Sequence, residues 1–575
     1  MKKLLKFFKG YYKESVIAPL FKMLEASFEL LIPLVVAEII DVGIIGQNIS
    51  RIYSMFAIMI LLGIIGLSCA LCAQYFSAKA AVGVSSAIRS SLFSHIQSFS
   101  HSRTDSLGTS TLITRITSDV NTVQTGINLF LRLFMRSPFV VFGAMIMAFT
   151  INARLALIFT IVILLLAIVV FGIMLISIPI YKKVQNRLDR VVAKVRGNYT
   201  GTRVIRAFNK QSDEISDFDD RNEALTKLQL FAGRISALMN PLTYVLINLA
   251  IIMLIKYGAV SVNDGIISQG ELVALYNYMT QILVELIKLA NLIITLTKSS
   301  AGAKRISTIL DTKSDIAFSS EKDSSSEELA VEFDNVSFSY NESGDPAISN
   351  ISFKVKKGDT VGIIGATGCG KSTLVNLIPG FYHPTSGSVF INGKNTALYD
   401  SEKLRSMCGV VEQKPALFKG SVRSNLLWGK KDASDAELWS ALSLAQADEF
   451  IREKPEALDE PVKQNGSNFS GGQKQRLTIA RALVKRPEIL ILDDSASALD
   501  YATEAKLRSA IANLDYNPTK FIVSQRTSSI LHADLILVLD DGEISAMGTH
   551  EELLCSCDIY KEIYDSQFTT GGDKI

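Results

Sequence analysis

The first 300 residues contain six apolar stretches, each long enough to cross a lipid bilayer as a helix. A hydrocarbon core of about 30 Å takes about 20 helical residues. The fourth stretch, Leu155 to Tyr181, carries no charged residue, whereas Lys22, Glu25, Glu29 and Glu38 interrupt the first. A chain of this kind must begin with a helical membrane domain. The six stretches lie near 16–45, 52–76, 129–151, 155–181, 240–262 and 270–297.

The remainder of the chain has a different character. With 575 residues the chain is too long for a single core, and its 48% hydrophobic and 20% charged residues fit a lipid-embedded part joined to a soluble part. A Ser-rich, charged stretch from Ser319 to Glu328 indicates a solvated linker. After it, short β-type runs alternate with helical ones, which predicts an α/β domain. No basic patch of the kind that binds nucleic acid is found.

The charges of the loops predict the orientation of the spans. The two long segments, about 76–128 and 182–239, lie on the same side as the basic N-terminus, and the second is rich in Lys and Arg. The short connections at 42–51, 151–154 and 259–271 are nearly uncharged. By the positive-inside rule, both termini and both long segments are cytoplasmic. The expected location is a cell membrane, namely the bacterial inner membrane, with several passes through it.

The strongest local motif follows the apolar run from Thr360 to Ile364. It reads Gly-Ala-Thr-Gly-Cys-Gly-Lys-Ser-Thr and matches a phosphate-binding loop at a strand-to-helix junction. Its glycines let backbone N–H groups close round phosphates, Lys371 reaches the β and γ oxygens, and the Ser372 hydroxyl binds Mg²⁺. The motif therefore predicts ATP and magnesium as ligands. Its candidate ATP-binding residues are Gly365, Gly368, Gly370, Lys371, Ser372 and Thr373.

Two further motifs follow in the α/β part. The run from Ile489 to Asp493 predicts a buried strand that ends in a carboxylate, which would hold magnesium through water. Between this run and the phosphate loop stands Phe-Ser-Gly-Gly-Gln-Lys-Gln-Arg, which contains Ser470, Gly471, Gly472 and Gln473. This sequence resembles the signature of the ATP-binding-cassette ATPases, and the resemblance covers essentially the whole chain. It implies a six-helix transmembrane domain at 1–310, a linker at 311–329 and a nucleotide-binding domain at 330–575.

Single positions take their roles from this resemblance. Tyr340 resembles the aromatic residue that stacks on adenine, with a core tyrosine as the alternative. Gln413 resembles the glutamine that binds Mg²⁺ and senses the transmembrane domain, and Asp500 lies in a loop that crosses the dimer interface. Residues 107–120 and 201–208 resemble the tips of the cytoplasmic extensions, which bear short coupling helices.

Besides Gln464, which departs from a Glu-Arg-Gly-like sequence of the family, two positions that matter for hydrolysis depart from the family pattern. The family has a catalytic Glu directly after the strand-ending Asp, whereas this chain has Asp494. It has a His that contacts the γ-phosphate where this chain has Gln525. Asp is one methylene shorter, which displaces its carboxylate from the attacking water by about 1 Å or more, a shift worth on the order of 100-fold in rate. Gln cannot carry a proton. Neutral change in a working site is the alternative interpretation.

These departures, together with family geometry, predict a heterodimer. In the family, each ATP lies between the phosphate loop of one chain and the signature of the other. The chain's own site is expected to bind ATP and hydrolyse it slowly, while its intact signature completes the catalytic site of a second half-transporter. The resulting prediction is ATP-driven export of a small or amphiphilic, multidrug-type substrate by alternating access. A homodimeric lipid or peptide exporter and an ATP-gated channel or regulatory subunit remain open, whereas the six spans exclude a soluble cassette ATPase.

The substrate itself cannot be read from the sequence. A polar stripe at helical spacing in the sixth stretch comprises Tyr278, Gln281 and Glu285, followed by Lys288. Ionisable groups inside a membrane rarely face lipid, so the stripe is a candidate cargo path. An ion pair within the helix between Glu285 and Lys288 is the alternative.

Overall fold

A computed structural model describes residues 2–312, 328–340 and 344–568, and the chain divides into two compact units. The first comprises Met1–Gln97 and Ser110–Lys313, and the second comprises Ser98–Thr109 and Ser314–Ile575. Most of the expected linker at 311–329 lies outside the described residues. The prediction of a helical domain followed by an α/β domain is confirmed.

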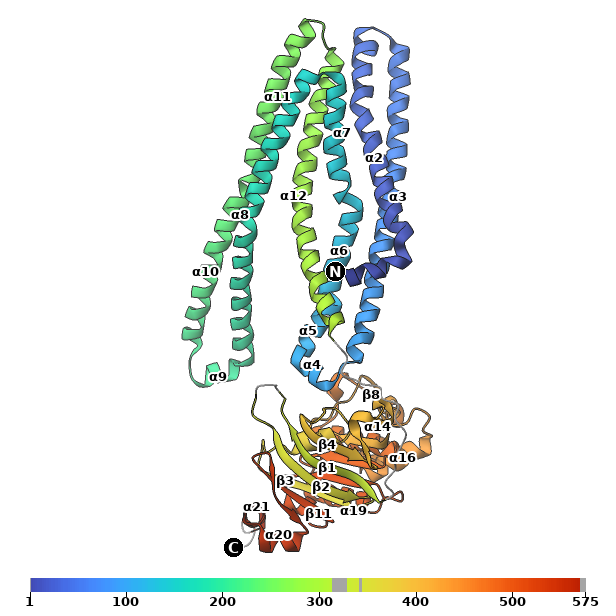
Figure 1. Cartoon of the computed structure of the whole chain (residues 1–575), viewed down its shortest axis with the longest axis vertical. Helices are drawn as coiled ribbons and strands as arrows, with labels where there is room; N and C mark the ends of the chain where they lie inside the picture. Colours follow the sequence, from blue (N-terminus) through green and yellow to red (C-terminus); the bar gives the residue numbers. More distant parts are fainter. Residues whose placement is uncertain (1, 313–327, 341–343, 569–575) are drawn as a thin grey trace. The chain divides into compact units, whose positions relative to one another are not determined.

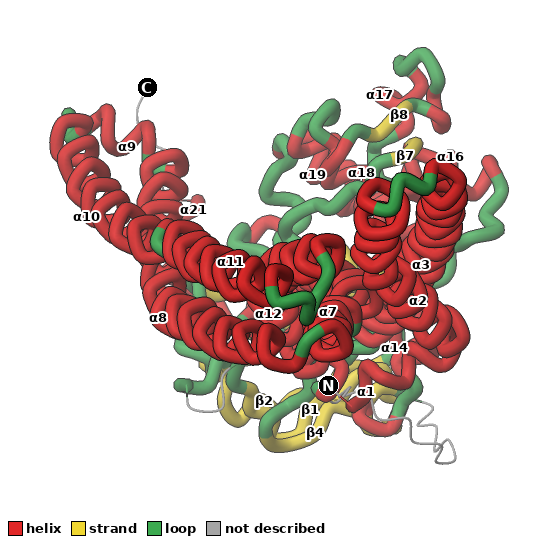
Figure 2. The backbone as a smooth tube through the Cα atoms, turned by 90° about the horizontal axis from the view of Figure 1, so that it is seen from above, coloured by secondary structure: helices red, strands yellow, loops and turns green. Residues whose placement is uncertain are grey.

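The first unit is entirely helical over its described residues, and its long helices pack lengthwise (Figure 1). The α2 helix pairs with α3, and α12 packs against α2, α6, α7 and α11. Seen from above, α8 and α11 run side by side, and α10 extends away from α2 and α3 (Figure 2). The elements are α1 (Lys2–Leu5), η1 (Lys6–Tyr11), α2 (Tyr12–Glu38), η2 (Ile39–Ile45), α3 (Ile49–Gln97), α5 (Thr109–Thr114), η3 (Arg115–Asp119), α6 (Val120–Leu129), η4 (Phe130–Phe134), α7 (Arg136–Ile151), α8 (Ala153–Thr200), α9 (Thr202–Ala207), α10 (Gln211–Ala237), α11 (Met239–Asn263) and α12 (Gln269–Asp311).

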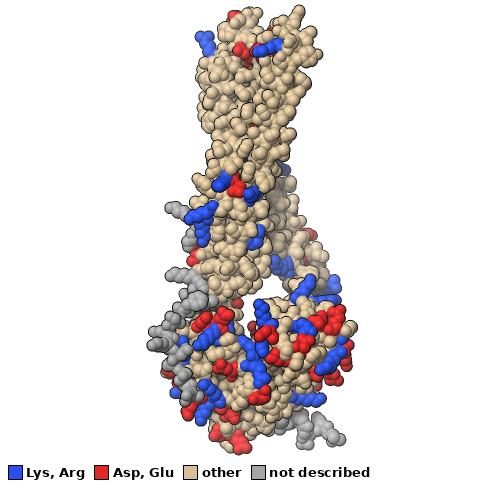
Figure 3. Space-filling model, turned by 90° about the vertical axis from the view of Figure 1, so that its right-hand side faces the viewer, with Lys and Arg blue, Asp and Glu red and all other residues tan. Residues whose placement is uncertain are grey.

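Five helical stretches among the described residues are long and apolar enough to cross a membrane. They cover five of the six expected spans. The first expected span falls on α2 and η2, which are not among the five and which contain Lys22, Glu25, Glu29, Glu38 and Asp41. Several helices run far beyond the expected spans, because α3 and α8 continue for 49 and 48 residues without a break. On the face drawn in Figure 3, few charged side chains lie over the apolar helices, whereas both signs are abundant on the second unit.

The second unit contains two main sheets. The larger has the strand order β12-β11-β3-β10-β9-β6, in which only β12 is antiparallel to its neighbour, and the smaller is an antiparallel sheet, β2-β1-β4-β5. The parallel strands β3, β9 and β10 are almost wholly buried, as expected of near-continuous apolar runs. The strands are β1 (Leu329–Phe338), β2 (Ile348–Lys356), β3 (Thr360–Gly365), β4 (Ser386–Ile391), β5 (Lys394–Asn395), β6 (Cys408–Val411), β7 (Gly420–Ser421), β8 (Pro461–Val462), β9 (Ile489–Asp493), β10 (Thr519–Val523), β11 (Leu535–Asp540) and β12 (Glu543–Gly548).

Helices pack on the parallel sheet, and several of them belong to the segment between β6 and β9. Buried residues from β6, α15, α16 and α18 form one apolar core, and residues from β1, β3, β4 and α13 form another. The helical elements are α4 (His101–Leu107), α13 (Lys371–Leu377), η5 (Thr396–Leu398), α14 (Ser401–Met407), α15 (Val422–Leu426), α16 (Asp435–Leu444), α17 (Asp448–Arg452), η6 (Ala457–Asp459), η7 (Gln464–Gly466), α18 (Gly471–Val484), α19 (Tyr501–Ala512), η8 (Thr527–Ser529), α20 (His550–Ser556) and α21 (Asp558–Phe568).

Candidate functional site

The candidate site lies at the carboxyl edge of the parallel sheet. The strands β3, β6, β9 and β10 are mutually parallel, so their carboxyl ends meet at one edge, where open α/β sheets bind ligands. The phosphate loop follows β3, Gln413 follows β6, and Asp493 ends β9. Gln525 comes two residues after the end of β10. Four strands therefore bring motifs that are far apart in sequence to one place.

The phosphate loop is held by backbone geometry and by its lysine. Gly370 caps α13 with φ of 94°, and a Cβ there would lie 2.6 Å from the carbonyl oxygen of Ala347, so no larger residue fits. The buried Lys371 Nζ donates hydrogen bonds to the carbonyl oxygens of Gly365 at 2.9 Å and Ala366 at 2.6 Å. The lysine charge therefore lies at the centre of the loop.

Two oxygen donors suited to magnesium lie side by side at the start of α13. The Ser372 hydroxyl donates to Asp493 Oδ1 at 3.0 Å. Burial raises the pKa of Asp493, and the neighbouring Asp494 charge adds to this, although the Ser372 hydrogen bond acts in the opposite direction. A buried carboxylate beside a hydroxyl is a ligand set that Mg²⁺ prefers. The residues present fit a Mg²⁺ ion bound together with phosphate oxygens.

Asp494 has an unusual backbone and a specific partner. Its φ is 44°, in the left-handed region, and its N–H donates to the carbonyl of Val523 at 3.0 Å. Its Oδ2 accepts a hydrogen bond from Gln413 Nε2 at 3.1 Å. The short carboxylate is therefore directed toward the glutamine that follows β6.

A cavity of about 260 Å³ gathers most of the predicted ATP-binding residues. Tyr340 lies on its wall with 49% of its surface exposed, and its hydroxyl is 3.0 Å from Thr373 Oγ1. It is therefore not a core tyrosine. Gln525 also lines the cavity, while its backbone carbonyl accepts from Gln567 Nε2. The described lining is Tyr340, Ala347, Thr367, Gly368, Gly370, Lys371, Ser372, Thr373, Gln413, Asp493, Asp494, Val523, Ser524 and Gln525.

The signature residues lie elsewhere in the same unit. Ser470 caps α18, its hydroxyl accepting from Gln473 N at 3.3 Å, and Gln473 Oε1 accepts from Ser470 N at 3.0 Å. This reciprocal capping box leaves the N–H groups of Gly471 and Gly472 in the first turn without intrahelical acceptors. Among the described residues that line the phosphate cavity, none comes from 470–473. Asp500 caps the next helix, α19, by accepting from Thr503 N.

One set of contacts in the second unit has no motif in the sequence. His101 of α4 stacks on Phe381 with ring centroids 4.5 Å apart, and Asp105 accepts a hydrogen bond from the Tyr382 hydroxyl at 2.7 Å. The helix α4 lies just before the stretch 107–120 to which the resemblance pointed. Only Ser100, which caps α4, gave a local signal for this helix. The partners 277 or more residues away could not be read from the sequence.

The polar stripe of α12 lies against α2 and α7. Tyr278 is fully buried and its hydroxyl donates to the carbonyl of Leu30 at 2.7 Å. Glu285 is also buried and binds Arg136 at 2.5 Å, Ser137 at 2.8 Å and Lys288 at 3.0 Å. The ion pair within α12 is therefore present as part of a larger network. The side-chain amide oxygen of Gln281, Oε1, is buried and has no hydrogen-bond partner among the described residues.

Comparison with known proteins identifies the family. Residues 15–286 match the ABC transporter transmembrane region and residues 348–497 match the ABC transporter family. An uncharacterized ABC transporter ATP-binding protein, YfiB, of Bacillus subtilis is 37% identical over 576 residues, covering 100% of both chains. Another from Mycobacterium tuberculosis, Rv1273c, is 34% identical and covers 94% of each chain.

A solved structure shows the same fold over nearly the whole chain. The structure of a bacterial Atm1-family ABC exporter with ATP bound matches with a TM-score of 0.81 at 23% identity, over 97% of this chain and 99% of that one. One family accounts for the nucleotide-binding fold, for the helical membrane unit and for the relatives that match nearly the whole chain. The chain belongs to the ABC transporter family, as a multi-pass membrane ATPase that couples ATP hydrolysis to transport.

Proposed function

We propose that the chain is one half of a heterodimeric exporter whose own nucleotide site retains ATP while the partner's site hydrolyses it. The observation that carries this proposal is an asymmetry within the second unit. Its phosphate cavity is lined by Asp494 and Gln525 at the two positions that carry out hydrolysis in the family. Its signature helix has every expected residue and a complete capping box.

The residues of the cavity support binding without fast hydrolysis. Lys371 and the loop amides would hold the phosphates, and Ser372, Asp493 and Gln413 would hold Mg²⁺, which supplies charge neutralisation when bound. The Asp494 carboxylate accepts from Gln413 and is one methylene shorter than the family's Glu, so it is poorly placed to polarise water. Gln525 offers a hydrogen bond to a phosphate oxygen but no proton.

Two features support the need for a second chain. Ser470 to Gln473 do not line the chain's own described cavity, so their exposed helix terminus is free to face a nucleotide bound elsewhere. At α9, the apolar side chains of Val204 and Phe208 are 61% and 73% exposed. Exposed apolar residues at a helix tip indicate a contact surface, and a partner's nucleotide-binding domain would cover it. The membrane would be the bacterial inner membrane, with both termini cytoplasmic.

The polar stripe of α12 supplies the candidate contacts with cargo. Within the stripe, Gln281 is the member whose buried polar atom lacks a partner among the described residues, which supports a role in contacting cargo. Glu285 is bound by Arg136 and Ser137, so Glu285→Gln should lower the thermal stability of the protein as well as transport. Gln281→Leu should change transport and cargo-stimulated ATPase and leave stability near normal. A loss of stability in Gln281→Leu that matches Glu285→Gln would remove the cargo-path assignment.

The heterodimer can be tested by purifying the chain alone and with candidate partner half-transporters encoded beside it. We expect an ATPase rate near background for the chain alone and a rate about 100-fold higher for the correct pair. Comparable turnover by the chain alone would favour the homodimeric exporter. Accumulation of cargo in inside-out vesicles by the pair separates an exporter from a channel or regulatory subunit, which would dissipate gradients only.

A further inference from the structure

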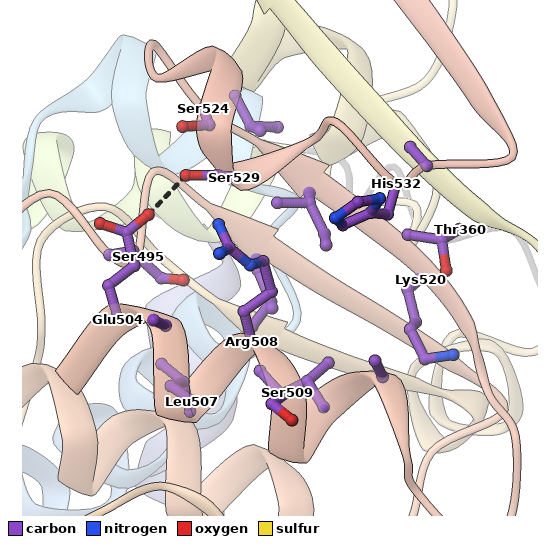
Figure 4. Close-up of a pocket in the computed structure, with 18 of the residues that line it drawn as sticks. Thr360, Ser495, Glu504, Leu507, Arg508, Ser509, Lys520, Ser524, Ser529 and His532 are labelled. Carbon is purple, nitrogen blue, oxygen red and sulfur yellow. Dashed lines mark hydrogen bonds between the residues drawn. The ribbon is translucent and has the colours of Figure 1, made fainter. Parts of the chain in front are cut away.

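A second cavity, of about 340 Å³, lies behind the phosphate cavity in the second unit. The helix α19 forms one wall, and β9, β10 and the start of β3 form the other (Figure 4). Its volume is within the range of small-molecule sites, about 300 to 1,000 Å³. None of the family motifs lies mainly within it. ATP binding and hydrolysis therefore give this cavity no role.

The two cavities share a wall. Asp494, Val523 and Ser524 line both of them. Asp494 holds the position of the family's catalytic carboxylate, and Ser524 directly precedes Gln525. A molecule in the rear cavity would therefore touch the backs of the segments whose front faces surround the nucleotide. It would also touch α19, which begins directly after Asp500.

One end of the rear cavity carries a lysine. Lys520 lines it with only 4% of its surface exposed, and no described acidic side chain forms a salt bridge with its Nζ. Burial lowers the pKa of Lys520, and the charge of the nearby Asp534 acts in the opposite direction. Figure 4 shows His532 between the two ends of the cavity and Lys520 beneath Thr360, whereas the Arg508 guanidinium lies toward Ser529 and donates to the carbonyl of Ser528. An ammonium group on the wall of a largely apolar cavity, with no salt bridge to a described carboxylate, gains from an anionic ligand.

Two acidic side chains also line the cavity, and both have partners, since Asp494 accepts a hydrogen bond from Gln413. Glu504 accepts from the Ser529 hydroxyl at 2.5 Å and forms a salt bridge with Arg526. Its charge is therefore largely compensated and does not repel an anion bound near Lys520. The space between the two ends is apolar. Its walls come from Leu492, Leu507, Ile511, Ile522 and several alanines.

We propose that this rear cavity binds a small carboxylate with an apolar body and thereby slows the ATPase cycle. The apolar body lies between α19 and β10, and the carboxylate binds Lys520. An occupant that bridges α19 and the strand ends resists movement of the loop before α19 and of the segment that carries Gln525. The site is separate from the nucleotide site, and its binding does not depend on which partner completes the transporter.

The binding test uses naphthoate, a fluorescent aromatic carboxylate, with the full-length chain in lipid nanodiscs and empty nanodiscs as background. We expect saturable binding at one site, and binding of the neutral analogue naphthamide at least about tenfold weaker. Lys520→Gln should weaken naphthoate binding by a similar factor. Ala512→Phe, at the exposed mouth of the cavity, should block it by filling space. Lys506→Gln, an exposed lysine of α19 that does not line the cavity, is the matched control and should bind as the parent does.

The functional test adds saturating naphthoate to the assembled transporter and measures ATPase. We expect a several-fold fall in rate that disappears in Ala512→Phe and persists in Lys506→Gln. Equal binding of naphthamide and naphthoate, or unchanged naphthoate binding in both Lys520→Gln and Ala512→Phe, would overturn the site. Binding with no effect on ATPase would overturn its regulatory role. Either failure leaves the heterodimer proposal untouched, because the naphthoate measurement does not involve the signature helix.

Discussion

The phosphate cavity and the signature helix are both built at helix N-termini that contain glycines, but they use their side chains differently. In the cavity, Lys371 and Ser372 turn inward, toward loop carbonyls and Asp493. At α18, Ser470 and Gln473 bind one another and leave the glycine face exposed. The cavity carries both departures from the family pattern, whereas the signature carries none. One chain can thus hold a nucleotide on one surface and assist hydrolysis with another.

The largest expected effect comes from damaging the signature rather than the cavity. Gly471→Asp adds a negative charge where the helix faces the partner's nucleotide, and we expect it to lower the ATPase of the assembled dimer about 100-fold or more. A Cβ at Gly471 meets no atom within 4 Å, whereas one at Gly472 lies 3.0 Å from the carbonyl of Ala498. Gly471→Asp therefore tests the contact with less strain within the chain than Gly472→Asp.

The matched change in the phosphate cavity is Lys371→Ala, measured in the same assembled dimer at saturating ATP. It should reduce ATPase by only a few fold, because this site turns over slowly in the parent. Gly471→Ala controls for the loss of glycine and should retain most activity. A nearly silent Gly471→Asp beside a Lys371→Ala that abolishes turnover would reverse the comparison and end the heterodimer assignment.

Restoring the family's residues at positions 494 and 525 should have a smaller effect. Asp494→Glu with Gln525→His returns the longer carboxylate and an imidazole, and we expect the chain's own site to gain about tenfold or more in turnover. The measurement requires a dimer in which the partner's catalytic carboxylate has been removed, so that only this site contributes. The single changes serve as controls and should each gain less. A double variant that stays at background would locate the deficiency elsewhere, for instance in the partner's signature.

The smallest expected effect concerns pH. Burial raises the pKa of Asp493 on the cavity side, whereas hydrogen bonds from Thr503 lower the pKa of Asp500 near the signature side. As pH falls, Asp493 takes up its proton first and loses its value as a metal ligand, while Asp500 stays ionised. Manganese affinity of the ATP-loaded chain, followed by spin resonance, should fall by up to about tenfold per pH unit on the acid side. Asp493→Asn should remove this slope, and a slope that persists in that variant would contradict the assignment.

The sequence was most informative where a function depends on consecutive residues. The phosphate loop, the strand that ends at Asp493 and the signature each carry their glycines, hydroxyls and carboxylates within a few positions, and parallel strands then predict that their ends meet. The fold class followed from apolar length and from the strand-helix alternation. The bounds of α3 and α8 did not, because these helices continue into polar segments after their apolar stretches end.

Contacts between distant segments could not be predicted. Asp105 with Tyr382, and Glu285 with Arg136, join residues 277 and 149 positions apart, and no local pattern in the sequence links the two members of either pair. The stripe on α12 was visible as a polar pattern, but its role depends on what lies opposite. For Tyr278 that neighbour is a backbone carbonyl of α2. The rear cavity likewise depends on how α19 packs against the sheet.

The central claim is that this chain retains ATP while its partner hydrolyses it. The most direct test is photo-crosslinking of an azido-ATP to the assembled, turning-over dimer, with the radiolabel on either the α- or the γ-phosphate. The α-label should appear on both chains after cross-linking, because both bind nucleotide. The γ-label should remain on this chain through many turnovers and be depleted from the partner. Equal depletion of the γ-label from both chains, or its retention on the partner alone, would contradict the account.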